Sequence, residues 1–227
     1  MNVELSASLM CADFSRLETS VEQLKAGGVN RLHLDFADGH FVPSLLLGTE
    51  VLQLPAVTSG LRIESHLMVD APQRYLDSFT TGSDVVILHV ESSGDLRAAL
   101  ESIRRAGRTP GLALRPETPT GAIRPFLPAI DLVLVLSVTP GFAGGQFIPE
   151  AVDKVRELRS IIASQGRDID IEVDGSINER TIPPLRDAGA NIFVGGSSGL
   201  FVGDDLTVRA RLLLEAAKMT LHTEGHR

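Results

Sequence analysis

The stretch Arg31-Leu-His-Leu-Asp-Phe-Ala-Asp-Gly-His-Phe-Val-Pro43 decides how the rest of the chain is interpreted. Apolar and polar side chains alternate from Leu32 to Asp35, which predicts a strand with His33 and Asp35 on one face. A turn signal, Asp38-Gly-His40, follows, so both side chains lie near the carboxyl end of the strand, where parallel α/β folds place their chemistry. A His-x-Asp pair can also be a buried hydrogen-bonded pair, and other residues of the chain decide between these interpretations.

Short apolar segments alternate with longer helix-like segments along the chain. We predict strands at residues 4–9, 31–36, 61–67, 85–90, 110–114, 132–136, 170–173 and 191–195. Helices are predicted at residues 15–26, 72–80, 96–106, 149–164, 181–188 and 205–218, with Gly27, Gly107, Gly166 and Gly189 as helix stops. Proline residues shorten any helix after the second and fifth strands. Eight βα units of about 28 residues predict an α/β chain folded as a single (β/α)8 barrel of the TIM type.

The length and composition of the chain limit its number of domains, its partners and its location in the cell. At 227 residues, we expect one barrel domain over residues 1–227, with a loose tail from about residue 220. The net charge of −8 and a pI near 5.2 argue against nucleic acid as a partner, and no apolar run approaches the roughly 20 residues of a membrane span. The first residues lack a secretory signal pattern, and the single cysteine, Cys11, is interpreted as a small buried hydrophobe. We therefore expect a cytoplasmic protein.

Polar side chains gather at the carboxyl ends of several predicted strands, where barrel enzymes carry their catalytic groups. His66 ends the third strand and Asp174 follows the seventh, so both join His33 and Asp35 at one end of the barrel. Two imidazoles and two carboxylates form a mixed nitrogen and oxygen set that suits Zn, Mn, Fe or Co better than Mg or Ca. His89, in the fourth strand, is either a further ligand or a buried hydrogen-bonded histidine.

Glycine-rich segments follow the last three predicted strands, at residues 137–146, 174–176 and 194–199. Barrel enzymes commonly bind phosphate at such loops, because glycine lets backbone N–H groups approach the anion. The alternative is that these glycines serve only tight turns. The chain has no Gly-x-Gly-x-x-Gly after its first strand and no Gly-Lys-Ser/Thr loop, so dinucleotide and nucleoside-triphosphate sites are not expected.

A metal site beside a phosphate site favours proton chemistry next to the carbonyl of a sugar phosphate. A divalent ion stabilises the enediolate that forms when a proton leaves carbon beside a ketone. Carboxylates on both sides of the planar carbon can remove a proton and return one on the opposite face, which inverts that centre. Asp35 and Asp174 are the carboxylates that we expect to act in this way.

The motifs that carry these residues are similar to those of a known family. They are Ser8-Leu-Met, His33-Leu-Asp35, Asp38-Gly-His-Phe-Val-Pro43, His66-Leu-Met-Val69, Pro140-Gly-Phe142 and Glu172-Val-Asp-Gly175. Over nearly its whole length, the chain resembles the ribulose-phosphate 3-epimerase family. The resemblance implies one divalent metal ion held by His33, Asp35, His66 and Asp174. It also implies that Asp35 and Asp174 act as acid and base around a cis-enediolate.

The resemblance further implies a phosphorylated ketose as substrate and self-association into a homo-oligomer. Substrate contacts are implied for Ser8, His66, Gly141, Phe142, Ala143, Gly144, Asp174, Gly175, Ser176, Gly196 and Ser197. Departures from the family pattern concern the choice of sugar. Its pentulose-phosphate enzymes usually carry Met at Ala37 and Leu136, Asn at Ser44 and Gly at Ser176.

Segments such as Pro116-Glu-Thr-Pro119 and Ser198-Gly-Leu-Phe201 look more like the allulose-6-phosphate 3-epimerase branch. The predicted reaction is therefore inversion of C3 in a ketose phosphate. The substrate pair is either D-ribulose 5-phosphate and D-xylulose 5-phosphate, or D-allulose 6-phosphate and D-fructose 6-phosphate. The alternatives are a barrel metal hydrolase that acts on a phosphorylated small molecule, and a phosphate-binding protein without catalysis.

Overall fold

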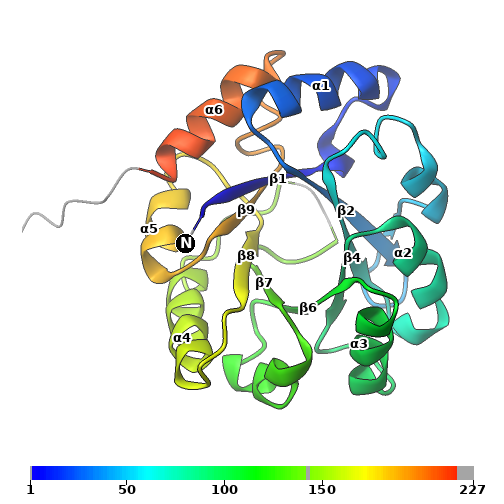
Figure 1. The fold of residues 1–227 in the computed structure, drawn as a ribbon. Helices are drawn as coiled ribbons and strands as arrows, with labels where there is room; N and C mark the ends of the chain where they lie inside the picture. Colours follow the sequence, from blue (N-terminus) through cyan, green and yellow to red (C-terminus); the bar gives the residue numbers. More distant parts are fainter. Residues whose placement is uncertain (1, 142–143, 219–227) are drawn as a thin grey trace, which may run out of the picture.

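Eight parallel strands form a closed barrel at the centre of this computed structural model, which describes residues 2–141 and 144–218. The strands are β1 (Glu4–Ser8), β2 (Arg31–Asp38), β4 (Arg62–Met68), β5 (Val85–His89), β6 (Thr109–Leu114), β7 (Leu132–Leu136), β8 (Asp170–Asp174) and β9 (Ile192–Gly195). Around the barrel the order is β1-β9-β8-β7-β6-β5-β4-β2, and pairing of β1 with β2 closes the ring (Figure 1). The predicted single (β/α)8 barrel is confirmed.

Helices surround the strands on the outside (Figure 1). They are α1 (Leu17–Gly27), α2 (Leu76–Gly82), α3 (Leu96–Arg105), α4 (Ala151–Ser164), α5 (Ile182–Ala188) and α6 (Leu206–Ala216). Within the described residues, none of these helices combines the length and the apolar character that a membrane crossing requires. The predictions of a single domain over residues 1–227 and of a loose tail stay predictions, because residue 1 and residues 219–227 lie outside the described part.

Short 3-10 helices replace α-helix where the sequence is least helical. They are η1 (Leu9–Cys11), η2 (Phe14–Arg16), η3 (Thr49–Gln53), η4 (Pro72–Arg74) and η5 (Thr120–Ala129). η5 contains Pro125 and Pro128, which lack the N–H group that an α-helix needs in its interior. The two-residue strand β3 (Leu45–Leu46) was not predicted, and it pairs antiparallel with the end of β2.

The sequence predicted Gly27 as the residue that stops the first helix, but Gly27 is the last residue of α1 itself. The residue that caps the helix is Gly28, which has a left-handed φ of 95° and donates its N–H to the carbonyls of the last turn. Gly27 instead lies against α6, which is next to α1 in the ring (Figure 1). A Cβ atom at Gly27 would be 2.6 Å from the Cβ of Ala210 and 3.0 Å from the carbonyl oxygen of Thr207. The glycine thus allows the first and last helices to pack closely.

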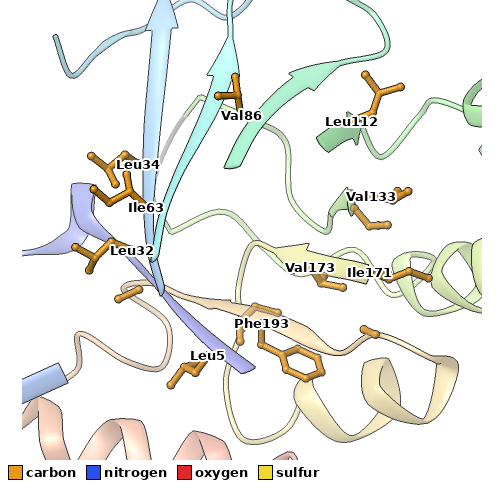
Figure 2. Packing of buried hydrophobic residues seen from close by; sticks show 14 of the residues in the cluster. Leu5, Leu32, Leu34, Ile63, Val86, Leu112, Val133, Ile171, Val173 and Phe193 are labelled. Carbon is orange, nitrogen blue, oxygen red and sulfur yellow. The ribbon is translucent and has the colours of Figure 1, made fainter. Parts of the chain in front are cut away.

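Side chains that point outward from the strands form the main hydrophobic core between barrel and helices. Figure 2 shows part of this layer, with Leu5, Leu32, Leu34, Ile63, Val86, Leu112, Val133, Ile171, Val173 and Phe193 labelled. All of them are buried. Full burial of an aliphatic or aromatic side chain contributes about 1.5–3 kcal/mol. Because strand side chains alternate between faces, filling this layer fixes which residues point into the barrel.

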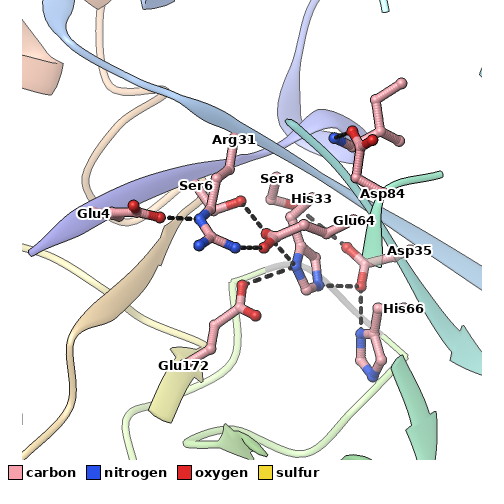
Figure 3. Close-up of polar contacts among 11 residues, drawn as sticks. Glu4, Ser6, Ser8, Arg31, His33, Asp35, Glu64, His66, Asp84 and Glu172 are labelled. Carbon is pink, nitrogen blue, oxygen red and sulfur yellow. Dashed lines mark hydrogen bonds and ion pairs between the residues drawn. The ribbon is translucent and has the colours of Figure 1, made fainter. Parts of the chain in front are cut away.

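The barrel interior has an apolar half and a polar half. Seven buried residues form the apolar half: Val85, Ile87, Ala113, Leu132, Leu134, Leu136 and Ile192. The polar half comes from β1, β2, β4 and β8 and includes Ser6, Arg31, His33, Glu64 and Glu172, each no more than 3% exposed. Arg31 is paired with Glu4 and Glu64, and the Ser6 hydroxyl donates to Glu64 Oε2 over 2.7 Å (Figure 3). The polar half continues directly into the candidate site.

The close approach of α1 and α6 predicts a cost for any side chain at Gly27. We expect Gly27→Ala to lower the free energy of unfolding by about 1–3 kcal/mol, because the added methyl group forces the two helices apart. Urea denaturation of both proteins would measure this difference. Gly121→Ala is the matched control, because a Cβ at Gly121 meets no atom within 4 Å. Equal losses in the two variants would contradict the packing argument.

Candidate active site

The carboxyl ends of β2, β4 and β8 bring together the four residues predicted as metal ligands. Asp35 lies opposite His66 in the register of β2 and β4, and β1 and β9 separate β2 from β8. His33, Asp35, His66 and Asp174 each offer one ligand atom, and these atoms all lie within 4.8 Å of one another. The structure therefore contains a candidate metal site made of two imidazoles and two carboxylates.

The two histidines approach Asp35 through different ring nitrogens (Figure 3). His33 Nε2 is 3.4 Å from Asp35 Oδ1, whereas His66 uses Nδ1, at 2.8 Å from the same oxygen. The Ser8 hydroxyl donates to Asp35 Oδ2 over 3.3 Å. On its other side, His33 Nδ1 is 3.2 Å from Glu172 Oε1. The contact with Glu172 on the far side of the ring therefore helps to fix the orientation of His33.

One buried atom tests whether these residues fit a metal ion. His33 Nε2 is buried and has no hydrogen-bond partner among the described residues, although buried polar groups are normally paired. It faces the point that Asp35, His66 and Asp174 share. An imidazole nitrogen in that position suits a divalent cation, and the mixed nitrogen and oxygen donors match Zn, Mn, Fe or Co. The site fits the predicted ion.

The two carboxyl groups have pKa values that differ in direction. Burial favours the neutral form of Asp35, but the neighbouring imidazoles, above all the charge of His33 and then His66, hold the pKa of Asp35 well below its ordinary value. Asp174 lies partly exposed, and the surrounding protein and the charge of Asp35 raise the pKa of Asp174 to about 6, against the lowering effect of His33 and His66. Near neutral pH, Asp174 is the group that more readily holds a proton.

Glu64 and Glu172 lie beside His33 beneath the site and are functional neighbours that were not predicted from the sequence. Burial opposes ionisation of Glu64, but hydrogen bonding to His33 and the charge of Arg31 lower the pKa of Glu64 to about 2. Burial and the charge of Glu64 raise the pKa of Glu172 to about 8. A signal was present in the sequence: each glutamate stands two residues before a predicted ligand, His66 or Asp174, and so shares its face of the strand.

A pocket opens at this end of the barrel. Every described residue that was predicted to contact substrate lines it: Ser8, His66, Gly141, Gly144, Asp174, Gly175, Ser176, Gly196 and Ser197. The predicted contacts Phe142 and Ala143 lie outside the described residues. Leu136 lines the pocket, whereas Ala37 is not part of the lining and packs in a small buried cluster with Val42 and Met68. Of the two departures from the family's methionines, only Leu136 borders the pocket directly.

The glycine-rich loops have backbone conformations that restrict substitution. Gly175 has a φ of 114°, and a Cβ atom there would be 2.6 Å from Val138 Cγ2. Among the described residues, Ser176 is the non-glycine residue with a positive φ, at 50°. Its hydroxyl donates to the carbonyl of Gly145, and its own carbonyl accepts from Asn178 Nδ2 and the Thr181 hydroxyl. Ser176 thereby joins the loop after β8 to the loop after β7.

The structure bears on two residues with no assigned part in the ligand set: His89, for which the sequence allows two roles, and Cys11, predicted to be a small buried hydrophobe. His89 is buried and does not belong to the set of four ligand candidates, but its Nε2 is 2.8 Å from His66 Nε2. It is a hydrogen-bonded neighbour of the site, which is one of its two predicted roles. Cys11 is only partly buried and lines the pocket, so its interpretation as a buried hydrophobe was incomplete.

Known proteins with similar sequences identify the class of this enzyme. Residues 4–201 match the model of the ribulose-phosphate 3 epimerase family. The relatives named below carry the name of a carbohydrate epimerase, and this chain is an enzyme of that isomerase class. The chain belongs to the ribulose-phosphate 3-epimerase family.

Two relatives illustrate the degree of similarity. The ribulose-phosphate 3-epimerase of Bacillus subtilis is 34% identical over 198 residues, which are 86% of this chain and 91% of the relative. The ribulose-phosphate 3-epimerase of Treponema pallidum is 40% identical over 195 residues, which are 86% of this chain and 89% of the relative. The family membership favours an epimerase over the metal hydrolase and the non-catalytic binding protein.

Solved structures with low sequence identity share the barrel. KGPDC from Streptococcus mutans has a TM-score of 0.68 at 13% identity and covers 96% of this chain and 98% of its own. The 3-hexulose-6-phosphate synthase from Salmonella typhimurium has a TM-score of 0.66 at 14% identity, with 95% of this chain and 98% of its own covered. At these identities the likeness concerns the fold alone.

The raised pKa of Asp174 predicts a pH-dependent gain in stability for Asp174→Asn in chelator-treated protein. The pKa is about 6 in the folded state and about 3.9 in an unfolded chain, so ionisation destabilises the wild type as the pH rises from 4 to 6. Asparagine does not ionise. We expect the variant to exceed the wild type by up to about 3 kcal/mol above pH 6, and by nearly nothing at pH 4.

Urea denaturation between pH 4.5 and 8 in the presence of a chelator would measure this difference. An advantage of the variant that is the same at every pH would show that Asp174 has an ordinary pKa in the folded protein. A variant that is less stable than the wild type at pH 7.5 would contradict the repulsion between Asp174 and Asp35.

Proposed function

We propose that this chain is a metal-dependent epimerase that inverts C3 of a ketose phosphate. The observation that carries the proposal is the convergence of Asp35 and Asp174, from strands on two sides of the barrel mouth, on one point with His33 and His66. The pocket above them is bordered by three glycine-containing loops. Membership of the ribulose-phosphate 3-epimerase family supports the same reaction.

His33, Asp35, His66 and Asp174 are the residues that would hold the ion. When bound, a divalent ion supplies Lewis-acid stabilisation of the two oxygens of an enediolate. The chain contributes the donor set and its orientation, since Glu172 lies behind His33 and Ser8 donates to Asp35. Zn, Mn, Fe and Co remain the candidate ions, because the donor set accepts each of them.

Asp35 and Asp174 divide the proton transfer according to their pKa directions. In one direction of the reaction, the Asp35 carboxylate removes the proton from C3, and the electrons of the C–H bond pass into the enediolate. Asp174, which holds a proton more readily, gives its own proton to the opposite face of C3. The reverse direction exchanges the two roles. Afterwards Asp35 carries a proton and Asp174 lacks one, and exchange with water restores the starting state.

The glycine-rich loops that border the pocket are proposed to bind the phosphate. Gly144, Gly175 and Gly196 lie on three successive loops of the pocket wall, and Ser197 adds a hydroxyl group. Backbone N–H groups at such loops bind anions, and glycine permits the close approach. This placement leaves the ketose between the phosphate loops and the two aspartates.

D-ribulose 5-phosphate, with D-xylulose 5-phosphate as product, is the first substrate candidate, because the relatives above are named for it. D-allulose 6-phosphate, with D-fructose 6-phosphate as product, is the second. The segments Pro116-Glu-Thr-Pro119 and Ser198-Gly-Leu-Phe201, which look like those of the allulose-6-phosphate 3-epimerase branch, support the second candidate. The reaction is the same for both sugars.

We also propose that the enzyme is a cytoplasmic homo-oligomer that acts on a small molecule without a nucleic-acid or membrane partner. The net charge of −8 supports the absence of nucleic acid, because a surface for phosphodiester backbones is usually basic. Exposed apolar side chains such as Phe14 and Leu54 are consistent with contacts between subunits.

The proposed reaction predicts exchange of one substrate proton. In deuterium oxide, zinc-loaded enzyme should replace the C3 proton of its substrate by deuterium while the epimer appears. Proton NMR with D-ribulose 5-phosphate and D-allulose 6-phosphate in separate samples would follow both events. Exchange with only one sugar identifies the substrate, and exchange with both indicates a tolerant pocket. Absence of exchange with either sugar would contradict the proposed function.

The double role of Asp174 predicts a severe defect in Asp174→Asn. We expect turnover to fall by about 10²–10⁴-fold and metal binding to weaken, because one carboxylate serves as ligand and as proton donor. Coupled assays of epimer formation and metal analysis would measure the two effects. Asp70→Asn, an exposed carboxylate at the same end of the barrel, is the matched control and should retain activity. Near-normal turnover of Asp174→Asn would exclude the mechanism.

A further inference from the structure

A second buried histidine and a glutamate stand behind the ligand candidate His66. His89 ends β5 and its side chain is fully buried. Its Nε2 is 2.8 Å from His66 Nε2, and its Nδ1 is 2.9 Å from Glu91 Oε2. The planes of the two imidazole rings are inclined by 30°, with ring centroids 5.0 Å apart. These contacts form a line from Glu91 through His89 to the nitrogen of His66 that faces away from Asp35.

The hydrogen bonds that Glu91 accepts determine which ring nitrogens of His89 and His66 carry a proton. Glu91 Oε1 accepts from the backbone N–H of Arg115 over 2.9 Å and from the Thr118 hydroxyl. A carboxylate only accepts, so the N–H between Glu91 and His89 belongs to His89 Nδ1. A neutral imidazole carries one N–H, and His89 Nε2 is therefore an acceptor. The proton between the two rings then belongs to His66 Nε2.

We infer that the Glu91–His89 pair is a positioning device that holds His66 in its Nε2–H tautomer and leaves the lone pair of Nδ1 directed into the candidate metal site. His66 Nδ1 and Asp35 Oδ1 are then two acceptors 2.8 Å apart, an arrangement expected of two ligands of one cation. The opposite tautomer would place the lone pair of His89 Nδ1 against the Glu91 carboxylate. This inference rests on the proposed function only in naming a metal ion as the guest.

The pair is anchored from outside the site. Lys154 of α4 donates from Nζ to the carbonyls of Arg115, Pro116 and Thr118, at 2.7, 2.7 and 2.6 Å. These bonds fix the loop after β6, which in turn supplies both donors to Glu91 Oε1. The guanidinium of Arg115 lies 4.0 Å from the centre of the Phe41 ring, and that ring packs on His89. Glu91 is thus held by the loop before any ion binds.

His33 has a comparable arrangement in which its two ring nitrogens exchange roles. Its Nδ1 faces Glu172, and its Nε2 faces Asp35. Each predicted histidine ligand therefore has a glutamate behind it, directly for His33 and through His89 for His66. Groups that orient a metal-binding imidazole typically change metal affinity by about 10–100-fold when they are replaced.

Glu91→Gln tests the inference because it should exchange donor and acceptor in both hydrogen bonds, the one between residue 91 and His89 and the one between His89 and His66. The amide oxygen would keep the bonds from Arg115 and Thr118, so the NH₂ group would point at His89 Nδ1 and donate to it. His89 would then carry its proton on Nε2, and His66 would carry its own on Nδ1. We expect a roughly 10–100-fold loss of Zn affinity in competition with a chromophoric chelator.

Long-range ¹H–¹⁵N spectra of the imidazoles in metal-free protein report the tautomers directly. The expected result is Nε2–H for His66 in the wild type and Nδ1–H in Glu91→Gln. Glu117→Gln is the matched control, because Glu117 lies in the neighbouring loop after β6 with a side chain that is 69% exposed, and the substitution removes the same charge. Its zinc affinity and its His66 tautomer should be those of the wild type.

Two results would overturn the inference: the same His66 tautomer in Glu91→Gln as in the wild type, or equal losses of zinc affinity in Glu91→Gln and Glu117→Gln. If Glu91→Gln does not fold, His89→Phe should give the Nδ1–H tautomer of His66, because the phenyl ring accepts no hydrogen bond at that nitrogen. Failure of the proposed function is distinguishable, since it appears as wild-type protein that neither binds zinc nor exchanges a substrate proton. The spectra of metal-free protein still decide the tautomer in that case.

Discussion

The hydrogen bonds between β1 and β2 close the barrel, and the geometry of the candidate site depends on that closure. Ser8 lies opposite His33 across this seam, and the Ser8 hydroxyl donates to Asp35. Asp174 reaches the same point from the other direction around the ring, through β8, β9 and β1. In an open sheet, these residues would lie on separate strands with no common centre. Closure therefore brings the four ligand candidates together before any ion is present.

The polar half of the barrel interior has an electrostatic cost that its hydrogen bonds offset only in part. A buried charge costs several kcal/mol unless it is paired. Arg31 and Glu64 are paired with each other, whereas Glu172 Oε2 and His33 Nε2 have no partner among the described residues. Asp35 and Asp174 repel each other at the mouth. A cation at the shared point would relieve this repulsion, so binding and stability are expected to be linked.

Much of the fold and of the ligand set could be predicted from local patterns. Alternation in residues 31–36 set the face of His33 and Asp35, and the repeat of strand and helix set the barrel. The end of α1 was placed one residue early, because Gly27 and Gly28 are adjacent and only the packing against Ala210 shows which of them is inside the helix. Local sequence does not report such contacts between the two ends of the chain.

The polar neighbours of the ligands were harder to predict. Glu91 lies beyond the end of β5, and its carboxylate meets His89 only because the loop after β6 supplies two donors to it. The contact between His66 and His89 likewise depends on how β4 and β5 pair. Strand periodicity indicates which face a residue occupies, but it does not indicate which nitrogen of a ring meets which neighbour.

The division of the barrel interior into two halves separates the residues that serve the reaction from those that shape the space for the sugar. Evolution can therefore change substrate choice and reaction independently. The charged residues stand on β1, β2, β4 and β8, while the side chains of β5 to β7 that face the interior are largely apolar. Leu136 belongs to the apolar half and also borders the pocket. Apolar substitutions on those strands can reshape the space for a sugar without removing a proton-transferring or ligand group. A barrel built in this way can diversify its substrates while it conserves its reaction.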